Sequence, residues 1–312
     1  MQTALSVDRR QKLRQFLASR AGQHLSDNRV ARIEQSLRPI MASAGLISLD
    51  ALVDWISAEP SGALASQSLD AMLNNETSFF RDPPLFHSLI TSALPSIHAR
   101  RREKRTLRIW SAACSTGQEA FSLAMAFADQ RHLWNGWKIE IVGTDLSARA
   151  IARAREGRYN QLEIQRGLST VQMLRYFRQE RTDWIARDEL RDMTLFRQFN
   201  ILESPLILGK FDMILCRNLL IYQDEECRRR TVANLRLAMV RDGLLMLGAT
   251  ETILGLGNWF VPSTAYRGLY EAADRVPPLL PVGPTADARA LAKGSSSLNL
   301  NTDAVDRFSQ SR

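Results

Sequence analysis

The hydrophobic residues of the N-terminal part of the chain recur at helical spacing. Within each of three groups, apolar side chains lie one, three or four positions apart and share one face of a helix. The groups are Leu13, Phe16 and Leu17, then Val30, Ile33 and Leu37, and then Leu49, Leu52, Val53 and Ile56. Serines at positions 6, 26 and 48 stand where helix N-caps are expected. This pattern predicts a small all-helical domain over residues 1–73.

Beyond residue 84 the pattern changes to short apolar runs that alternate with helical stretches. A helix is predicted at about residues 85–97. Strands are expected at 107–111, 138–143, 211–216, 243–248 and near 266–272, with helices at about 119–130, 147–156 and 224–240. Strands separated by helices imply parallel βαβ units. The fold class predicted for residues 74–273 is therefore α/β, with a doubly wound, Rossmann-like sheet.

This alternation is interrupted between residues 159 and 202. Residues 168–177 have the pattern of a short helix, 184–186 that of a small strand, and 194–199 that of a return to the main sheet. We therefore predict that about residues 160–192 form an insertion at one edge of the sheet. From Asp274 onward, prolines and a Gly-Ser run replace the apolar periodicity, which predicts a disordered tail over residues 274–312.

The composition is that of an ordinary folded protein. The 312 residues are 45% hydrophobic and 24% charged. No apolar run has the length of a membrane span, and the N-terminus lacks the pattern of a secretory signal. Cys114, Cys216 and Cys227 form no C-x-x-C pair, and the four histidines have no partner at metal-ligand spacing. We therefore expect a cytoplasmic protein with no membrane insertion and no metal.

The net charge of +8 raises the question of nucleic-acid binding. Residues 1–40 hold eight Arg or Lys against three acidic residues, and a second basic cluster at 100–105 precedes the first predicted strand. No aromatic residues interleave either cluster, which weakens the case for single-stranded nucleic acid. A solvated loop is the favoured interpretation of residues 100–105. The N-terminal excess of positive charge equally suits an acidic protein partner.

Small and polar residues follow the predicted strands where a nucleotide-type pocket forms. The segment 111–117 runs from a strand through small residues into a helix, where backbone can approach a ligand closely. Asp145, Asn200 and Asn218 follow other strands. Because the carboxyl ends of parallel strands meet at one sheet edge, these side chains are expected to face one crevice. Simpler readings stay open: a tight turn at 112–117, a helix N-cap at Asp145 and a turn residue at Asn200.

Three motifs in this order resemble the CheR family, S-adenosylmethionine-dependent methyltransferases that esterify glutamate side chains of bacterial chemoreceptors. Asn75–Arg81 matches N-x-T-x-F-F-R, Trp110–Glu119 matches W-S-A-A-C-S-T-G-[EQ]-E, and Phe211–Tyr222 matches F-D-x-I-x-C-R-N-x-x-I-Y. The resemblance covers about residues 10–272. It implies a helical N-terminal domain followed by a Rossmann-like methyltransferase domain with a small β-subdomain insertion. It also implies S-adenosylmethionine as cofactor, S-adenosylhomocysteine as product, and chemoreceptor methylation helices as partners.

The resemblance further implies which residues contact the cofactor. The family's contacts fall on Asn75, Thr77, Arg81, Glu119, Asp145, Asn200, Ile201, Asn218 and Leu219. Among them, Glu119 would bind the cofactor's amino group, Asp145 the ribose hydroxyls and Asn200 the adenine.

Arg81 and Tyr222 are the candidates for catalysis. Arg81 is expected to orient a carboxylate through its guanidinium fork, and Tyr222 either donates a hydrogen bond or walls the pocket. A glutamate is already ionised at neutral pH, so no general base is required. Arg29 and Arg32 lie one turn apart, share a helix face, and would attract glutamate-rich substrate helices.

The insertion is short, and this bears on how a substrate is recruited. Nine residues separate Phe177 from the run at 187–190, fewer than the glycine-bearing loop of members that bind a receptor's C-terminal peptide requires. We therefore expect no dependence on such a tether. Two other functions stay open, a methyltransferase for RNA or a small molecule and a non-catalytic adaptor that binds the cofactor. Against RNA, Leu85 replaces the aromatic residue of a D-P-P-aromatic loop and no RNA-binding motif is appended, so no nucleic-acid partner is expected.

Overall fold

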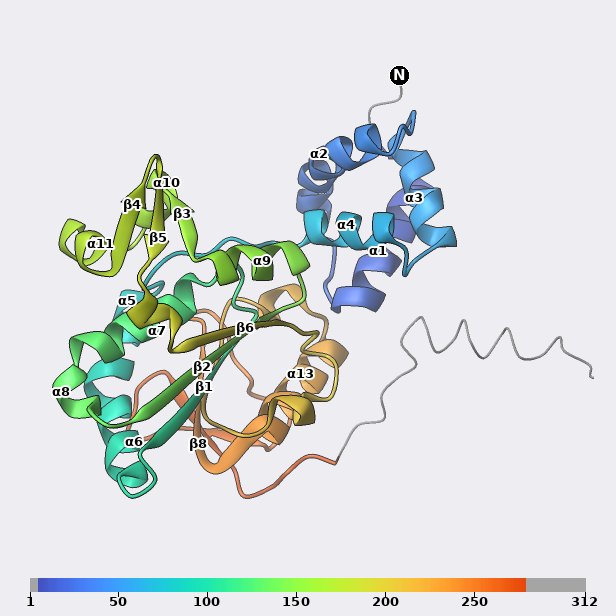
Figure 1. Ribbon diagram of the computed structural model, residues 1–312. Helices are drawn as coiled ribbons and strands as arrows, with labels where there is room; N and C mark the ends of the chain where they lie inside the picture. Colours follow the sequence, from blue (N-terminus) through green and yellow to red (C-terminus); the bar gives the residue numbers. More distant parts are fainter. Residues whose placement is uncertain (1–4, 279–312) are drawn as a thin grey trace, which may run out of the picture.

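The computed structural model describes residues 5–278, and a bundle of helices forms the N-terminal part of them (Figure 1). Its helices are α1 (Val7–Ala21), α2 (Asp27–Ser43), α3 (Leu49–Ala58) and α4 (Ala63–Met72). The apolar groups predicted to share helix faces are buried in one core, where Leu17, Leu37 and Leu52 are almost fully enclosed. The expected N-cap serines precede α1, α2 and α3, but only Ser48 accepts a capping hydrogen bond, from the backbone N–H of Ala51.

The main sheet has seven strands in the order β6-β2-β1-β7-β8-β10-β9. They are β1 (Thr106–Ala112), β2 (Lys138–Asp145), β6 (Thr194–Gln198), β7 (Phe211–Cys216), β8 (Met239–Leu247), β9 (Phe260–Pro262) and β10 (Leu269–Ala272). The five strands from β6 to β8 run parallel, whereas β10 and β9 are antiparallel to their neighbours. The predicted α/β class is therefore confirmed. The strand order reverses between β1 and β7, where such sheets place a ligand crevice.

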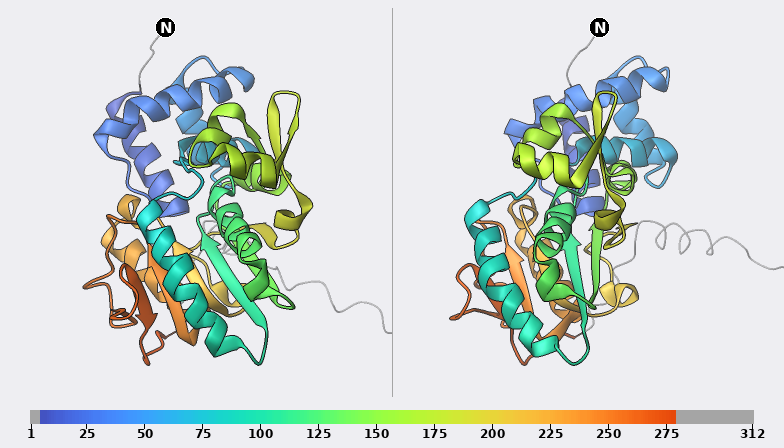
Figure 2. Two further views of the ribbon diagram at one scale, coloured as in Figure 1. Left: turned by 90° about the vertical axis from the view of Figure 1, so that its left-hand side faces the viewer. Right: turned by 60° about the vertical axis from the view of Figure 1, so that its left-hand side comes forward.

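Helices cover both faces of this sheet. They are α5 (Pro83–Ser88), the π-helical η1 (Leu89–Ala93), α6 (Leu94–Arg101), α7 (Gln118–Asp129), α8 (Arg131–Trp134), α9 (Ala148–Glu156) and α13 (Glu225–Ala238). Alternate residues of β1 point to opposite faces: Ile109 belongs to the core beneath α6 and α7, and Trp110 to the core beneath α13. Figure 2 shows α6 and α7 on the same side of the sheet. The helix predicted at 85–97 is longer than expected, since α5, η1 and α6 continue one another.

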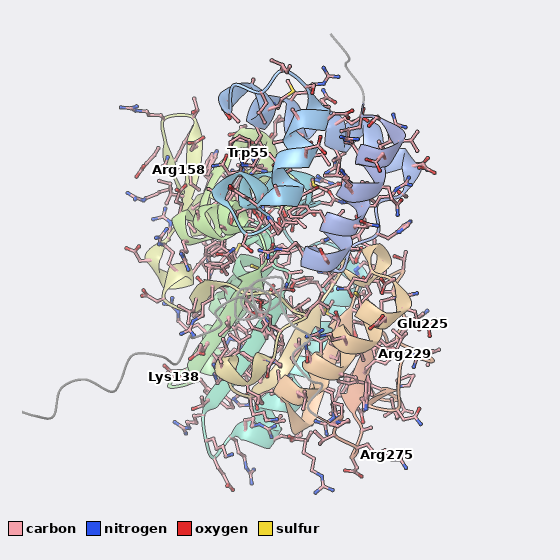
Figure 3. The ribbon with its side chains drawn as sticks, turned by 90° about the vertical axis from the view of Figure 1, so that its right-hand side faces the viewer. Trp55, Lys138, Arg158, Glu225, Arg229 and Arg275 are labelled. Atoms are coloured by element: carbon pink, nitrogen blue, oxygen red, sulfur yellow. The ribbon has the colours of Figure 1, made fainter. Side chains whose placement is uncertain are left out.

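Helix α13 shows how the outer layer meets solvent. Glu225 and Arg229 lie one turn apart on its exposed face and form an ion pair of 2.6 Å (Figure 3). Its inward side buries Val232 and Leu235 against the sheet. This amphipathic division explains why the sequence pattern located the helix correctly.

The insertion forms a separate three-stranded sheet, ordered β3-β5-β4, that stands apart from the main sheet (Figure 1). Its elements are β3 (Arg158–Asn160), α10 (Gln161–Gln165), α11 (Thr170–Tyr176), β4 (Phe177–Glu180), β5 (Asp183–Ala186) and α12 (Asp188–Arg191). The sequence indicated only β5 and the helix at 170–176. Strands β3 and β4 were missed because exposed polar residues, such as Arg178 and Gln179, leave them little apolar signal.

The basic cluster at 100–105 is only partly the solvated loop that was expected. Arg101 ends α6, and its guanidinium bonds to Asp212 at 2.6 Å and to Asp242 at 2.7 Å. Arg100 donates to the backbone carbonyl of Asp242 at 2.8 Å. The expectation was therefore wrong for these two arginines, because acidic residues distant in sequence lie beside them.

Among residues 5–278, no helix has both the length and the apolar character needed to cross a membrane.

Two short 3-10 helices, η2 (Pro205–Leu208) and η3 (Leu220–Tyr222), follow β6 and β7. The expected tail begins at Asp274, and residues 274–278 contain no helix or strand, while the rest of the predicted tail lies outside the described residues.

Candidate active site

A pocket of about 870 Å³, including space open to solvent, lies at the carboxyl ends of β1, β2 and β7. All nine residues predicted to contact the cofactor line it: Asn75, Thr77, Arg81, Glu119, Asp145, Asn200, Ile201, Asn218 and Leu219. The structure therefore brings these residues together. The βα order indicated this for Asp145, Asn200 and Asn218, and the resemblance implied it for the others; their contacts with a cofactor stay a prediction.

The loop between β1 and α7 turns its backbone sharply beside the pocket. Ala113 and Ser115 have φ values of 57° and 52°, and Gly117 has a φ of 94°. The left-handed region is costly for residues with a Cβ, so these positions are strained. Ser115 is held there by two bonds, because its backbone N–H donates to Asp145 at 2.9 Å and its hydroxyl donates to the carbonyl of Asn75 at 2.7 Å. The reading as a tight turn of small residues is therefore correct, and the turn forms the pocket wall.

Asp145 ends β2 with its carboxylate buried in the pocket wall. Its Oδ2 accepts from the backbone N–H of Ser115 and its Oδ1 from that of Ser147, both at 2.9 Å. Burial raises the pKa of Asp145, and the two backbone hydrogen bonds oppose this effect. The N-cap of α9 is Ser147, whose hydroxyl accepts from the backbone N–H of Ala150 at 3.0 Å. The alternative reading of Asp145 as that cap is therefore wrong.

A buried ion-pair network lies beneath the pocket, centred on Arg217. This side chain is only 3% exposed, and its guanidinium nitrogens lie 2.9 Å from Glu119 and 2.8 Å from Asp82. Glu119 also accepts from the hydroxyl of Ser111 at 2.7 Å. A buried charge requires such partners. Arg217 was quoted within a motif but given no role, and the available signal was a basic residue directly after the apolar run at residues 213–216.

Arg81 lies at the mouth of this network. Its guanidinium donates to the backbone carbonyl of Glu76 at 2.9 Å, and its own carbonyl accepts from Arg217. Arg81 therefore combines a fixed backbone with a half-buried side chain that lines the pocket. Glu76 itself pairs with Arg166 of the insertion at 2.6 Å, which lowers the pKa of its carboxyl.

Asn200 is engaged by protein groups on both sides of its amide. Its Nδ2 donates to the carbonyl of Arg20 at 3.0 Å, and its Oδ1 accepts from the backbone N–H of Leu202 at 3.1 Å. The second bond closes a short turn over residues 200–202, so Asn200 is also the turn residue that the sequence left open as an alternative. The first ties the end of α1 to the pocket wall. Recognition of adenine by Asn200 stays a prediction.

The loop after β7 depends on a residue that the sequence did not single out. Asn218 has a φ of 58°, and its backbone N–H donates to Glu251 at 2.6 Å. The same carboxylate accepts from the backbone N–H groups of Leu220 at 2.8 Å and Gly248 at 2.9 Å. Glu251 therefore fixes the conformation that presents Asn218 and Leu219 to the pocket.

Tyr222, Arg29 and Arg32 lie outside the pocket wall. The hydroxyl of Tyr222 accepts from Asn74 at 2.6 Å, and the guanidinium of Arg29 lies 5.0 Å from the centre of the tyrosine ring. Arg29 also donates to the carbonyl of Met72 at 3.3 Å, and its burial lowers its pKa. Arg32 is exposed and donates to Asn74 at 2.9 Å. All three side chains contact residues 72–74, the segment at the end of α4 and just after it. Their roles in catalysis and substrate binding stay predictions.

The site residues include no metal cluster. Among residues 5–278, no group of three or more His, Cys, Asp or Glu side chains is arranged to hold a metal ion. Cys114 and Cys216 lie near the pocket, but burial raises the pKa of both thiols far above the usual value. Neither is therefore an activated nucleophile.

Comparison with solved structures adds little to this picture. The glycopeptide N-methyltransferase MtfA is 18% identical and aligns over 50% of this chain and 56% of its own, with a TM-score of 0.30. That score is too low to carry an argument, so the fold assignment depends on the strand order described above.

Sequence comparison is decisive. Residues 75–268 match the model of the CheR methyltransferase, SAM binding domain. Chemotaxis protein methyltransferase Cher2 of Pseudomonas putida is 37% identical over 254 residues, covering 80% of this chain and 92% of the relative. Chemotaxis protein methyltransferase 1 of Pseudomonas aeruginosa is 37% identical over 251 residues, covering 79% and 91%. The chain therefore belongs to the CheR methyltransferase family.

Proposed function

We propose that this protein is a protein-glutamate O-methyltransferase that uses S-adenosylmethionine to esterify glutamate side chains of chemoreceptors. Its relatives named above are chemotaxis protein methyltransferases. The observation that carries the proposal is the convergence of nine expected cofactor residues on one pocket at the switch point of the sheet. The charged groups around that pocket suit both ends of an amino-acid nucleoside.

The pocket residues fit this cofactor on chemical grounds. Each oxygen of Asp145 accepts one backbone hydrogen bond and keeps further acceptor capacity, which suits two ribose hydroxyls. Glu119 provides a carboxylate for the cofactor's amino group, and Arg217 fixes its direction. The strained turn at Ala113 and Ser115 exposes backbone for close approach.

When bound, S-adenosylmethionine supplies an electrophilic methyl group on a sulfonium. The tasks left to the chain are to align the substrate carboxylate and to exclude water. Because a glutamate has an unperturbed pKa of about 4.3, no residue has to remove a proton at neutral pH. Alignment at about 3–3.5 Å can supply several kcal/mol of rate enhancement. We assign orientation of the carboxylate to Arg81, whose planar guanidinium lines the pocket mouth.

Substrate recruitment follows from the surfaces beside the pocket. Arg32 is exposed on α2 and would attract glutamate-rich receptor helices, whereas Arg29 is half-buried against Tyr222 and would act mainly by holding the bundle in place. The hairpin of β4 and β5 turns through Arg181 and Thr182 alone. So short a hairpin supports independence from a receptor's C-terminal peptide. Specific binding of such a peptide, lost when residues 178–186 are altered, would contradict this.

The test is transfer of a radiolabelled methyl group to receptor-enriched membranes. We expect label on receptor protein that mild base releases, since carboxyl methyl esters are base-labile. An Asp145→Ala variant under identical conditions serves as the negative control. Label on RNA would instead favour a nucleic-acid substrate, and binding of S-adenosylhomocysteine without transfer would favour an adaptor; either result contradicts the proposal.

A further inference from the structure

The helical bundle contributes to the wall of the pocket through the segment that follows α1. Ala21 and Gln23 line the pocket together with Phe199, Asn200 and Ile201. The matched SAM-binding domain begins only at position 75, so these two residues lie far outside it in sequence. The pocket is therefore completed by a part of the chain that the family's cofactor domain does not include.

This segment is held firmly against the methyltransferase fold. The carbonyl of Arg20 accepts from Asn200 at 3.0 Å, and the backbone N–H of His24 donates to the carbonyl of Tyr222 at 2.7 Å. Between these two bonds, a Cβ on Gly22 would lie 2.8 Å from a methyl of Leu202. The segment therefore lies in close contact with the loops after β6 and β7, and the position of Gln23 is fixed.

The side chain of Gln23 is buried without a hydrogen-bond partner for its Oε1 among residues 5–278. The residue is 7% exposed. The side chain of its β-bridge partner, Gln223, makes no hydrogen bond with it. Oε1 of Gln223 accepts from Thr231 at 3.0 Å, and its Nε2 also has no partner. A buried amide oxygen without a partner is costly, and in the wall of a pocket it offers a bound ligand a hydrogen-bond acceptor.

The sheet order shows which end of the ligand Gln23 faces. Glu119 lies in the first turn of α7, after β1, and Arg217 directly follows β7. Asp145 ends β2, and Asn200 follows β6 on the outer side of β2. If Glu119 holds the amino-acid end and Asp145 the ribose, the nucleobase lies beyond Asp145, beside Asn200. The segment that carries Gln23 bonds to Asn200 through the carbonyl of Arg20, and Gln23 lines the same pocket, so we place it on the nucleobase side.

We propose that Gln23 recognises the 6-amino edge of the adenine. Its Oε1 accepts a hydrogen bond from the 6-amino group, and its Nε2 donates to an adjacent ring nitrogen. This inference rests on the proposed function, because it requires S-adenosylmethionine in the pocket. It makes the helical bundle a determinant of cofactor specificity in addition to any role in substrate binding.

The test compares two ligands by isothermal titration calorimetry on the full chain. One is S-adenosylhomocysteine, and the other is its analogue with unsubstituted purine, which lacks the 6-amino group. The wild-type protein is expected to bind the analogue about tenfold more weakly, because Oε1 is then left unpaired. In Gln23→Leu, which keeps the bulk of the wall but has no amide, the ratio of the two Kd values should fall close to one.

Gln223→Ala is the matched control, because it removes the amide side chain across the same β-bridge at a residue that does not line the pocket, and it should keep the wild-type ratio. Gln23→Ala serves as a second variant, with thermal unfolding of each variant to check folding. A wild-type ratio near one, or an unchanged ratio in either folded variant of Gln23, would overturn the inference. Complete loss of S-adenosylhomocysteine binding in both folded variants would also overturn it, because Gln23 would then only maintain the shape of the pocket. If the wild type does not bind S-adenosylhomocysteine at all, the proposed function itself fails.

Discussion

Arg217, whose side chain is only 3% exposed, pairs with two carboxylates, Asp82 and Glu119, under the pocket. Burying one such group without its partner costs several kcal/mol, so the three side chains form a unit. The unit fixes where the carboxylate of Glu119 can point. It also connects the pocket to the backbone of Arg81, whose carbonyl accepts from the same guanidinium. The contacts of Arg217 therefore both neutralise the two carboxylates and position the backbone of Arg81.

Asp145→Ala should lower the affinity for S-adenosylhomocysteine by at least about a hundredfold, because two hydrogen bonds from ribose to a charged group are lost. The backbone N–H groups of Ser115 and Ser147 also lose their acceptor. Calorimetric titration measures the effect. Asp192→Ala, at an exposed position, is the control and should titrate as wild type. An unchanged titration of Asp145→Ala would refute the assignment.

Arg81→Ala should reduce kcat by about a hundredfold while changing cofactor affinity only a few-fold, because misalignment of a carboxylate affects the transition state most. Steady-state kinetics and S-adenosylhomocysteine titration separate the two effects. Arg81→Lys should recover only part of the loss, since an ammonium lacks the guanidinium fork. If affinity falls as far as kcat, Arg81 binds cofactor and does not orient substrate.

The sequence predicted the pocket residues that end strands and missed those that support them. Asp145 and Asn218 follow apolar runs, so the βα pattern sufficed to place them at one edge. Glu251 lies in a loop with no period or motif, and its partners are backbone groups that no sequence pattern reveals. The functional reading of Tyr222 depended on the motif alone, and its contact with Asn74 arises only from tertiary packing.

At the scale of elements, the strand ends and the loops after them are tied together by side chains from distant segments. Glu251 bonds to the loop after β7 and to Gly248 at the end of β8. Arg101 bonds the end of α6 to Asp212 of β7 and Asp242 of β8. The contacts of Glu251 support the strand ends that border the pocket, and those of Arg101 lie at the opposite ends of the same strands.

Glu251→Ala should lower both the free energy of unfolding and the affinity for S-adenosylhomocysteine. It leaves three backbone N–H groups without their acceptor, and each unsatisfied buried group costs roughly 1–3 kcal/mol. Glu251→Gln keeps one acceptor oxygen and should lose less. Urea unfolding and calorimetry give the two quantities. Glu226→Ala, on the exposed face of α13, is the control. Full affinity in a folded Glu251→Ala would show that the loop needs no such support.

Arg101→Gln should destabilise the protein at neutral pH and not in acid. The hydrogen bond from Arg101 lowers the pKa of Asp242 below its ordinary 3.8. The pairing therefore stabilises the folded state above that value, and the stabilisation is lost as pH falls through the depressed pKa. Because Asp242 is 47% exposed, we expect a difference of only about 1 kcal/mol at pH 7. Urea unfolding of wild type, Arg101→Gln and the exposed control Arg102→Gln at several pH values measures it; a pH-independent difference would contradict the expectation.

The arrangement of elements was predictable to different degrees. Each of the parallel strands β1, β2 and β7 ends in at least four buried residues and contains adjacent apolar side chains, so all three were located within a few residues. Strands β3 and β9 have three residues each, too few to show a period. The π-helical segment between α5 and α6 left the helical pattern intact, and only the end of that helix was misjudged.

For the whole molecule, the main departure from the sequence-based picture is the contact between the helical bundle and the pocket. The helices of the bundle were predicted from their own periodicity, which carries no information on where the bundle lies. Arg20 and Asn200 are 180 positions apart in the sequence, and the contact of His24 with Tyr222 has a similarly large separation. Both contacts involve mostly backbone atoms. Such pairings leave no local pattern to read.

Gly22→Ala tests this contact. Gly22 has a φ of +63°, and a Cβ would lie 2.9 Å from the sulfur of Cys227. The variant should lower both stability and affinity for S-adenosylhomocysteine. Gly45→Ala is a matched control, because its φ is +67° and nothing lies within 4 Å of its Cβ. That control should lose about 1 kcal/mol of stability through backbone strain and keep full affinity. Equal affinities in both variants would show that the bundle does not shape the pocket.

The placement of Ala21 and Gln23 around one pocket with Asn200 and Asn218 has a consequence for biosynthesis. During translation, the first helix leaves the ribosome long before the strands it must meet. Contacts of such high sequence separation form late, after local structure. A nascent chain that ends before residue 219 lacks part of the pocket wall, so it should be unable to retain the nucleoside. Binding competence would then appear in a single late step, when the growing polypeptide closes on its own beginning.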